Sequence, residues 1–355
     1  MNENSLKDIL IKRNTSIKAA MKALEKTAEK CLLVVNQDNK LLGTLTDGDL
    51  RRQILKGGKL SESIASCFND NPKILSKSEY EEKKAIRLME NNNLDLIPIL
   101  NREQIITGYV SRVNLKNDYP KKILKNNIPV VIMAGGKGTR MEPFTKVLPK
   151  PLVPVQDKTI IEHIIENFVQ VGCNDFYLMV NYKNRILKAY FEELQPNYDI
   201  FFTDEKKPLG TAGSLHFLEG KFEHPLFLTN CDIIVKIDYS ELYEFHKKGG
   251  FAITLVASFK EYKIPYGTCE LKPDGSLLRI NEKPKFDFLI NSGLYVINPE
   301  IFQIIPKNKF YHITHLIKDA AKKGEKIGVF PIQQDSWIDI GQWDEYKRAI
   351  NIFDK

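Results

Sequence analysis

Apolar residues in the first third of the chain follow a helical period and then form two short runs. Ile17, Ala20, Met21 and Leu24 are spaced to lie on one face of a helix. Residues 34–50 then align without a gap on residues 99–115, so the whole pattern recurs at an offset of 65. The alignment pairs Gly43 with Gly108, Leu45 with Val110, Thr46 with Ser111 and Leu50 with Leu115.

Each copy of this repeat is predicted to run helix, strand, turn, strand, helix. A single copy would leave an apolar sheet face uncovered, and two copies can cover each other. The sequence therefore predicts one compact domain made of two related halves over residues 1–118. Lys- and Asn-rich residues 119–127 are predicted to form a linker.

Strand-like and helix-like segments alternate over residues 128–355. This alternation predicts an α/β domain with helices on both faces of a sheet. Ligands of such sheets bind at the carboxyl ends of the strands. The expected strands are 130–133, 176–180, 200–202, 226–228, 252–257 and 294–297, and the expected helices are 159–170 and 185–194.

A Gly-rich turn directly follows the first of these strands. The stretch at 131–155 reads VIMAGGKGTRMEPFTKVLPKPLVPV and places two cations, Arg140 and Lys150, after the glycines. Glycines let backbone N–H groups approach phosphate oxygens closely, and the cations can offset the charge of a polyphosphate. The glycines are too close together for a GxGxxG fingerprint, and no GK[ST] follows them. Both the dinucleotide-binding and the Walker A patterns are therefore excluded.

Composition and charge add limits to this picture. The chain has 355 residues, 43% of them hydrophobic, which predicts two domains of a globular protein. A net charge of +7 spread along the chain suits anionic small molecules, and no nucleic-acid-binding motif is present. The polar N-terminus and the lack of a long apolar run predict a cytoplasmic protein without a membrane span. Five scattered cysteines predict small buried residues and neither a disulfide framework nor a zinc site.

The string AGGKGTRMEPFTKVLPKPLVPV resembles the signature of the sugar-1-phosphate nucleotidyltransferases. Further matches follow in order: LGTAGS at 209–214, LTNCD at 228–232, PYG at 265–267, EKP at 282–284, NSGLY at 291–295 and WIDIG at 337–341. The resemblance covers residues 128–355. It implies a Rossmann-like, GT-A-like domain with a mixed sheet that joins an NTP to a sugar 1-phosphate and releases pyrophosphate.

The resemblance also implies roles for individual residues. Arg140 would hold the β- and γ-phosphates, and Lys150 would bridge the phosphates near the α-phosphorus. Asp232 and Asp339 would be ligands of Mg²⁺, which prefers carboxylate oxygens and substrate phosphates. Contacts to the nucleotide fall on Ala134, Gly135, Gly136, Gly138, Thr139, Gly210 and Thr211. Contacts to the sugar phosphate fall on Gly267, Glu282, Lys283 and Asn291.

Structural roles are the alternatives for several of these side chains. Asp232 could form a turn or helix cap, Asp339 could fix the loop beside Trp337, and Glu282 and Asn291 could be structural. No His–Ser or Cys–His pair is evident, and none is needed. A phosphate monoester dianion is already a competent nucleophile, so positioning and charge neutralisation carry the rate.

The repeat in residues 1–118 resembles a tandem pair of CBS domains, a Bateman module. In that family a Ser/Thr and an Asp contact adenosine ligands, and Thr46 and Asp49 match this pattern in the first copy. The second copy has Ser111, but Asn114 replaces the Asp. The alternatives are a regulatory nucleotide site, or a module that only dimerises the protein, with Asp49 as a helix cap. CBS pairs commonly meet face to face as dimers, so the resemblance also implies a homo-oligomer.

A CBS pair in front of such a transferase resembles the guanylyltransferases of bacterial legionaminic-acid (nonulosonic-acid) pathways. This resemblance implies GTP and glucosamine 1-phosphate as substrates. The alternatives are mannose-1-phosphate guanylyl transfer, and glucose-1-phosphate cytidylyl or uridylyl transfer. An alternative of another class is a non-catalytic subunit that senses nucleotide sugars. Such a subunit would be expected to lose Arg140, Lys150 or an aspartate of the metal pair, and all are present.

Overall fold

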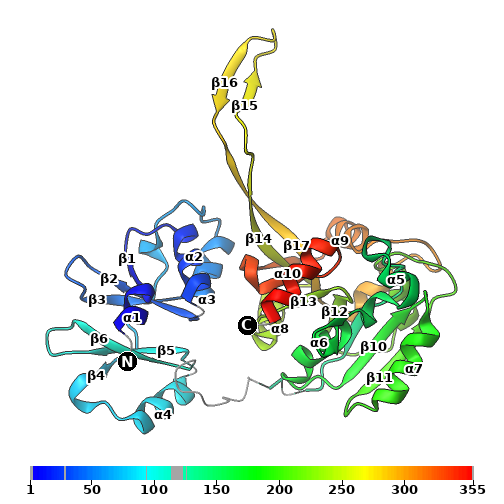
Figure 1. The fold of residues 1–355 in the computed structure, drawn as a ribbon, viewed down its shortest axis with the longest axis horizontal. Coiled ribbons are helices and arrows are strands. Elements are labelled where there is room, and N and C mark those ends of the chain that lie inside the picture. Colours follow the sequence, from blue (N-terminus) through cyan, green and yellow to red (C-terminus); the bar gives the residue numbers. More distant parts are fainter. Residues whose placement is uncertain (1–2, 28, 93, 113–122, 125, 354–355) are drawn as a thin grey trace. The chain divides into compact units, whose positions relative to one another are not determined.

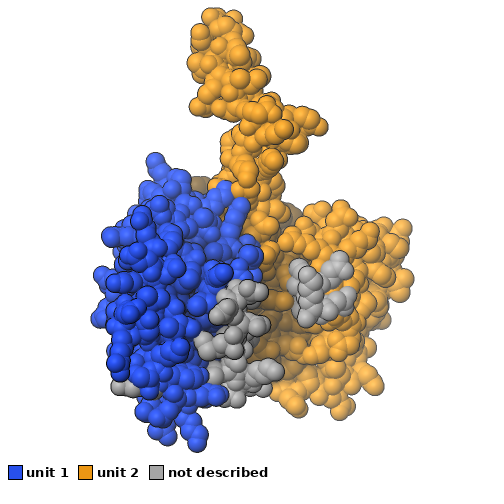
Figure 2. All heavy atoms as spheres, turned by 60° about the vertical axis from the view of Figure 1, so that its left-hand side comes forward, with its two compact units in different colours: residues 1–120 blue, residues 121–355 orange. Residues whose placement is uncertain are grey.

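The computed structural model describes residues 3–27, 29–92, 94–112, 123–124 and 126–353. The chain forms two compact units, residues 1–120 and 121–355 (Figure 2). Most of the predicted linker, 119–127, lies outside the described residues. Leu124, however, is buried in the core of the second unit, and its N–H donates to the Val171 carbonyl at 2.8 Å. This part of the predicted linker therefore packs as part of the second unit.

The first unit repeats its elements at the offset that the sequence shows. Helix α2 and strands β2 and β3 return as α4, β5 and β6, and both hairpins carry a register shift at the corresponding position. The two three-stranded sheets are β1-β2-β3 and β4-β5-β6 (Figure 1). The bounds are α1 Glu3–Ile9, β1 Leu10–Lys12, α2 Ile17–Thr27, β2 Cys31–Val35, β3 Leu41–Thr46, α3 Asp47–Leu55, β4 Leu75–Ser76, α4 Glu82–Asn92, β5 Leu96–Leu100 and β6 Ile106–Ser111.

In each copy, the turn between the two strands is closed by an asparagine side chain. Asn36 accepts hydrogen bonds from the N–H groups of Asp38 and Lys40 through its side-chain oxygen, and Asn101 does the same for Glu103 and Ile105. An asparagine that closes a turn on its own backbone fixes the hairpin register. Leu96, Leu100, Ile106 and Tyr109 of the second copy share one apolar core with the first copy. The two halves therefore cover each other, as predicted.

The second unit is built on a seven-stranded mixed sheet of order β11-β10-β7-β12-β17-β14-β18. The first four strands are parallel, β17 is antiparallel to β12 and β14, and β18 is parallel to β14. The mixed sheet agrees with the expected fold class. The strand bounds are β7 Val130–Met133, β8 Pro154–Val155, β9 Lys158–Thr159, β10 Asp175–Val180, β11 Asp199–Asp204, β12 Leu226–Asn230, β13 Ile233–Val235, β14 Ile253–Lys263, β15 Thr268–Leu271, β16 Leu277–Asn281, β17 Lys285–Ile297, β18 Ile327–Ile332 and β19 Trp337–Asp339.

Helices cover both faces of this sheet because the central strand is apolar on both sides. Val130 and Ile132 of β7 lie in one core cluster, and Val131 and Met133 lie in another. Helix α6 packs on the first face and begins with a capping box between Thr159 and Glu162. The helices are α5 Phe144–Val147, α6 Ile160–Val169, α7 Asn184–Leu194, α8 Tyr239–Gly249, α9 Ile313–Lys322 and α10 Trp343–Phe353.

A long two-stranded ribbon leaves the sheet of the second unit. Strand β14 pairs with β18 as far as Ser258, and β17 pairs with β12 only from Leu294 onward. Between these points β14 and β17 pair with each other alone, and the ribbon continues into the β15–β16 hairpin (Figure 1). We call residues 259–290 the arm. No described helix has the length and apolarity needed to cross a membrane.

Candidate active site

A cavity of about 250 Å³ lies beside the carboxyl end of β12, the neighbour of the first strand. It brings together four residues that the sequence singles out: Arg140, Asp232, Asn291 and Asp339. Arg140 comes from the loop after β7, Asn291 from β17 and Asp339 from the end of β19. The rest of the lining is Asn230, Ile233, Ser292, Gly293, Tyr295 and Trp337. This arrangement agrees with the expectation that ligands bind at the carboxyl ends of the strands.

Lys150 is held against the cavity by Asp232. Its Nζ lies 2.5 Å from Asp232 Oδ2, and the lysine side chain is only 8% exposed. Burial of an ammonium group is costly unless it is paired, so this ion pair fixes the direction of the lysine. Lys150 therefore stands where it can meet phosphate oxygens that approach Asp232.

Asp232 and Asp339 are brought together by a short strand pair. Ile233 of β13 is the register partner of Asp339 in β19, and the Ile340 N–H donates to the Asp232 carbonyl at 2.8 Å. Gly341 holds the second aspartate in place, because its N–H donates to Asp339 Oδ1 at 2.7 Å. A Cβ at Gly341 would meet that oxygen, Asp232 Oδ2 and Lys150 Nζ. A larger residue here would displace the side-chain ends that converge at this point.

The pKa of Asp339 is raised above that of an ordinary aspartate. Burial is the main cause, and the nearby charge of Asp232 adds to it, while the Gly341 N–H, Lys150 and Arg140 act in the opposite direction. Two neighbouring carboxylates that are partly shielded from water repel each other. A divalent cation bound between them would offset this repulsion. The described residues contain no group of three His, Cys, Asp or Glu side chains placed for a metal. Two carboxylates completed by substrate phosphates are nevertheless a usual Mg²⁺ arrangement.

The Gly-rich loop has one glycine in a backbone conformation that other residues rarely adopt. Gly138 has φ +67°, and a Cβ there would meet the Thr145 methyl group at 2.9 Å and Lys150 Cβ at 3.1 Å. Thr145 Oγ1 also donates to the Gly138 carbonyl at 2.9 Å. Gly136, by contrast, has open space on its Cβ side. The loop is thus anchored at Gly138 and accessible at Gly136, which suits a cradle for phosphates.

The other predicted nucleotide contacts differ in how accessible their backbone is. The Ala134 N–H already donates to the Met179 carbonyl at 2.8 Å, so Ala134 has no N–H left for a phosphate. Thr139 is exposed and begins a short 3₁₀ turn. Gly210 has φ +82° and packs against the backbone of Tyr311. Thr211 Oγ1 accepts from the Ile313 N–H at 3.0 Å, so it also caps the start of α9.

Glu205 is a residue of this region that sequence reasoning missed. It follows β11 and is 7% exposed. A Cβ at Gly135 would lie 3.4 Å from Glu205 Oε1, and the Leu209 N–H donates to Oε2 at 3.3 Å. Burial raises the pKa of this carboxyl, and the nearby Ser214 hydroxyl and the Leu209 N–H act in the opposite direction. Glu205 lies five residues before Gly210 of the LGTAGS segment, and this position is the sequence signal that could have identified it.

Three of the four predicted sugar-phosphate contacts lie on the arm, outside the cavity. Asn291 is in the cavity and donates from Nδ2 to the Tyr295 hydroxyl at 2.7 Å. Gly267 and Glu282 contact each other, since a Cβ at Gly267 would lie 3.1 Å from Glu282 Oε2. Lys283 has φ +45° and lies 3.7 Å from Glu282. The described structure does not bring these three to Asp232, and their role in sugar binding stays a prediction.

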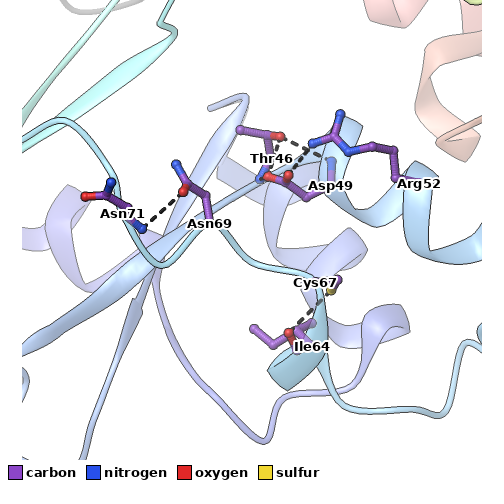
Figure 3. Close-up of polar contacts among 7 residues, drawn as sticks. All are labelled: Thr46, Asp49, Arg52, Ile64, Cys67, Asn69 and Asn71. Atoms are coloured by element: carbon purple, nitrogen blue, oxygen red, sulfur yellow. Dashed lines mark hydrogen bonds and ion pairs between the residues drawn. The ribbon is translucent and has the colours of Figure 1, made fainter.

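A second cavity, of about 420 Å³, lies in the first unit beside Thr46 and Asp49. Asp49 Oδ2 accepts from the Thr46 N–H at 2.8 Å and from its hydroxyl at 2.7 Å, and Arg52 pairs with the other oxygen (Figure 3). Thr46 and Asp49 thereby form the capping box of α3. Both therefore have the structural role considered from the sequence, and both also line a cavity. Ser111 bonds Glu29 at 3.0 Å, and Asn114 lies outside the described residues.

The cysteines are all free thiols, and most are buried. Cys31 and Cys173 are buried, as is Cys231, and burial raises the pKa of Cys173 and of Cys231 to about 12. Cys67 is half-buried. Cys269 is exposed near the tip of the arm, so the expectation of burial is wrong for this residue.

Comparison with protein families finds a match in each part of the chain. Residues 129–355 match the model of the nucleotidyl transferase family, and residues 5–56 match the CBS domain. The second CBS-like copy repeats the first in sequence and in its helix and strands. The solved structure of HddC from Yersinia pseudotuberculosis is similar, with a TM-score of 0.51 and 25% identity over 64% of this chain and 99% of that chain.

Curated relatives of this chain include two mannose-1-phosphate guanyltransferases. A mannose-1-phosphate guanyltransferase from Hypocrea jecorina is 36% identical over 225 residues, which is 60% of either chain. The protein of that name from Yarrowia lipolytica is 34% identical over 221 residues, with the same coverage. The chain therefore spans about 60% of the length of these relatives.

Proposed function

Because this chain belongs to the nucleotidyl transferase family, we propose that it transfers a guanylyl group from GTP to a sugar 1-phosphate and releases pyrophosphate. The observation that carries the proposal is the cavity in which Arg140, Asp232 and Asp339 meet, with Lys150 paired to Asp232 beside it. The guanyltransferase names of the curated relatives support the reaction type. No part of this chemistry needs a nucleophilic side chain.

The residues of the cavity act by holding and neutralising charge. The sugar phosphate oxygen attacks the α-phosphorus in line, and pyrophosphate leaves. Arg140 and the N–H groups around Gly136 hold the leaving phosphates, and Lys150 moves from Asp232 to the phosphates near the α-phosphorus. Removal of solvent around such charges strengthens each of these contacts.

Asp232 and Asp339 are proposed to hold Mg²⁺. Their carboxylates meet at Gly341, where burial, with the nearby charge of Asp232 adding to it, raises the pKa of Asp339. A bound Mg²⁺ would supply positive charge to the phosphate oxygens. Lys150 places a further positive charge beside Asp232 through its ion pair with that residue. The donor set therefore fits a magnesium ion completed by substrate phosphates.

The choice of guanine is supported by Glu205. The guanine base presents two adjacent donors, N1–H and the N2 amino group, to which the two oxygens of one carboxylate are complementary. Glu205 lies between Gly135 and the 209–214 segment, which are the two predicted nucleotide contacts. Uracil and thymine present a carbonyl oxygen on each side of their single N–H, which a carboxylate would repel.

The proposed acceptor is glucosamine 1-phosphate, in the synthesis of bacterial surface glycans or nonulosonic acids. The order of a CBS unit followed by a transferase unit supports this acceptor. Mannose 1-phosphate is the second candidate, because the curated relatives carry that name. A non-catalytic sensing role is disfavoured, because the cavity retains Arg140 and both aspartates.

The experiment that tests this function is pyrophosphate release over a grid of nucleotides and sugar phosphates. ATP, GTP, CTP, UTP and dTTP would each be combined with glucosamine, mannose and glucose 1-phosphates in the presence of Mg²⁺. The proposal expects the highest kcat/KM with GTP. Release with no pair, or a clear preference for UTP or dTTP, would contradict it.

A further inference from the structure

The arm exposes an unusual amount of apolar surface. Nine of the twenty large apolar side chains that are exposed among the described residues lie on it, although it is about a tenth of the chain. Every residue from Leu271 to Ile280 is exposed. The nine are Tyr262, Tyr266, Leu271, Leu277, Leu278, Ile280, Phe286, Phe288 and Leu289.

The tip of the arm has one polar and one apolar face. Glu270 pairs with Arg279 across the hairpin at 2.6 Å and accepts from Asn281 at 3.1 Å, which ties the polar face together. Cys269 is opposite Ile280 on the other face, because side chains alternate along each strand. A two-stranded ribbon is marginally stable in water unless one face is covered. The described part of the second unit offers no cover for this face.

The charge of the arm indicates what kind of surface covers it. The arm carries six Lys or Arg and five Asp or Glu, while the whole chain has a net charge of +7. A nearly neutral ribbon with both signs interspersed has little attraction for a polyanion or an anionic membrane. Apolar side chains with balanced charges suit a second copy of the same surface, which can meet itself about a two-fold axis.

The position of Lys283 adds a reason for a second copy. Lys283 is separated from Asn291, at the cavity, by about 26 Å of extended chain at ~3.3 Å per residue. The cavity already has Arg140 and Lys150 for the nucleotide, and its lining includes no other cation for a second phosphate. If two arms lie side by side in opposite directions, the tip of each arm points toward the base of the other. Lys283 of one chain would then lie near the cavity of the other chain.

We infer that two copies of this chain pair through their arms, and that the arm of each copy delivers Lys283 and Glu282 to the sugar-phosphate side of the other copy's cavity. Each active site is then composite. The nucleotide and Mg²⁺ side comes from one chain, and the partner's Lys283 neutralises the sugar phosphate. This inference rests on the proposed function for the role of Lys283, and on the arm itself for the pairing.

Complementation between two inactive variants tests delivery in trans. Asp232→Asn disables a cavity, and Lys283→Ala disables an arm. The two chains would be co-expressed with different affinity tags and purified through both tags, so that every assembly contains both variants. A mixed dimer has one site with both defects and one site with neither, so we expect about half of the wild-type turnover. Turnover no higher than that of either variant alone, or no recovery of mixed assemblies, would overturn the inference.

Two matched controls accompany this test. A mixture of Asp232→Asn with Arg140→Ala, both in the cavity, should stay inactive because neither site is repaired. Lys285→Ala removes a neighbouring arm lysine that pairs with Glu261 at 3.3 Å, and it should keep its activity. Wild-type turnover in the same assay shows separately whether the proposed function holds.

The size of the assembly tests the pairing without any need for activity. Leu278→Ser combined with Ile280→Ser makes the exposed apolar face polar and leaves the buried cores untouched. Sedimentation of the full chain should show that this variant has half the mass of the wild type. The control Leu194→Ser, at an exposed leucine of α7, should not change the mass. A monomeric wild type, or an unchanged mass in the double variant, would overturn the inference even if the protein had no transferase activity.

Discussion

Glu205 is the side chain on which the choice of base depends in our proposal. Glu205→Gln keeps the size of the side chain and replaces one acceptor oxygen by a donor, which would face the N–H groups of guanine. Loss of a paired hydrogen bond in a buried site is expected to raise the KM for GTP about 100-fold. Initial rates over a GTP series measure this change. Glu193→Gln, at an exposed position of α7, is the control, and an unchanged KM in Glu205→Gln would remove Glu205 from base recognition.

His246 gives a pH test of the packing around α8. Its ring nitrogens bond Thr254 Oγ1 and Asn298 Oδ1, both at 2.9 Å, and burial lowers its pKa below 6.5. The unfolded chain therefore takes up a proton near pH 6.5, while the folded chain takes it up only at lower pH. The free energy of unfolding should fall as pH drops below ~6.5, by at most about 1.4 kcal/mol per pH unit.

Urea unfolding at pH 7.5, 6.5 and 5.5 measures this effect. His246→Gln should show a smaller loss between pH 6.5 and 5.5 than the wild type, because the variant lacks the titrating ring. Equal losses in the two proteins would mean that His246 does not contribute to the acid sensitivity.

Part of the site could be predicted residue by residue, and part could not. Arg140, Asp232, Asn291 and Asp339 each follow a recognisable motif, and the fold gathers them into one cavity. Glu205 was missed because its place in the site depends on its close approach to Gly135. These two residues are 70 positions apart in the sequence.

The Gly-rich loop offers a test at the scale of an element. Gly138→Ala combines a strained φ of +67° with a collision against Thr145 and Lys150. We expect a stability loss of about 1–3 kcal/mol. Because Lys150 would move, kcat/KM should also fall about 100-fold. Thermal melting and initial rates measure the two effects.

Gly220→Ala is the matched control for the loop. Gly220 has φ +73° but open space on its Cβ side, so its substitution should cost stability through strain alone and leave kcat/KM unchanged. If both variants lost the same activity, the effect at Gly138 would be one of general stability, and the anchoring role of the loop would be contradicted.

Strand positions were more predictable than strand pairing. The repeat in the first unit and the main strands of the second unit follow apolar runs, because burial on both faces of a sheet requires them. The β13–β19 pair that joins the two aspartates was not predicted, since each strand has only three residues. The arm was also not predicted. Apolar residues in strands are expected to be buried in a core, and those of the arm are exposed.

At the scale of the whole molecule, the first unit raises the question of regulation. Its cavity beside Thr46 and Asp49 supports a site for a regulatory nucleotide, and the unit has its own apolar core. We expect an adenine or guanine nucleotide to raise the melting temperature of residues 1–120. At 100 times its Kd, the ligand adds about 2.7 kcal/mol to the free energy of unfolding. An unchanged melting temperature with every nucleotide would leave the helix cap as the role of Asp49.

The central claim is that the cavity around Asp232 performs nucleotidyl transfer, and the Asp232→Asn variant tests it most directly. Pyrophosphate release would be measured with GTP, a sugar 1-phosphate and Mg²⁺ for the wild type, for Asp232→Asn and for Asp199→Asn, which changes an exposed aspartate at the start of β11. We predict that Asp232→Asn lowers turnover about 10³-fold or more. The same variant should stay folded, and Asp199→Asn should retain wild-type turnover. Near-normal turnover of a folded Asp232→Asn protein would contradict the account.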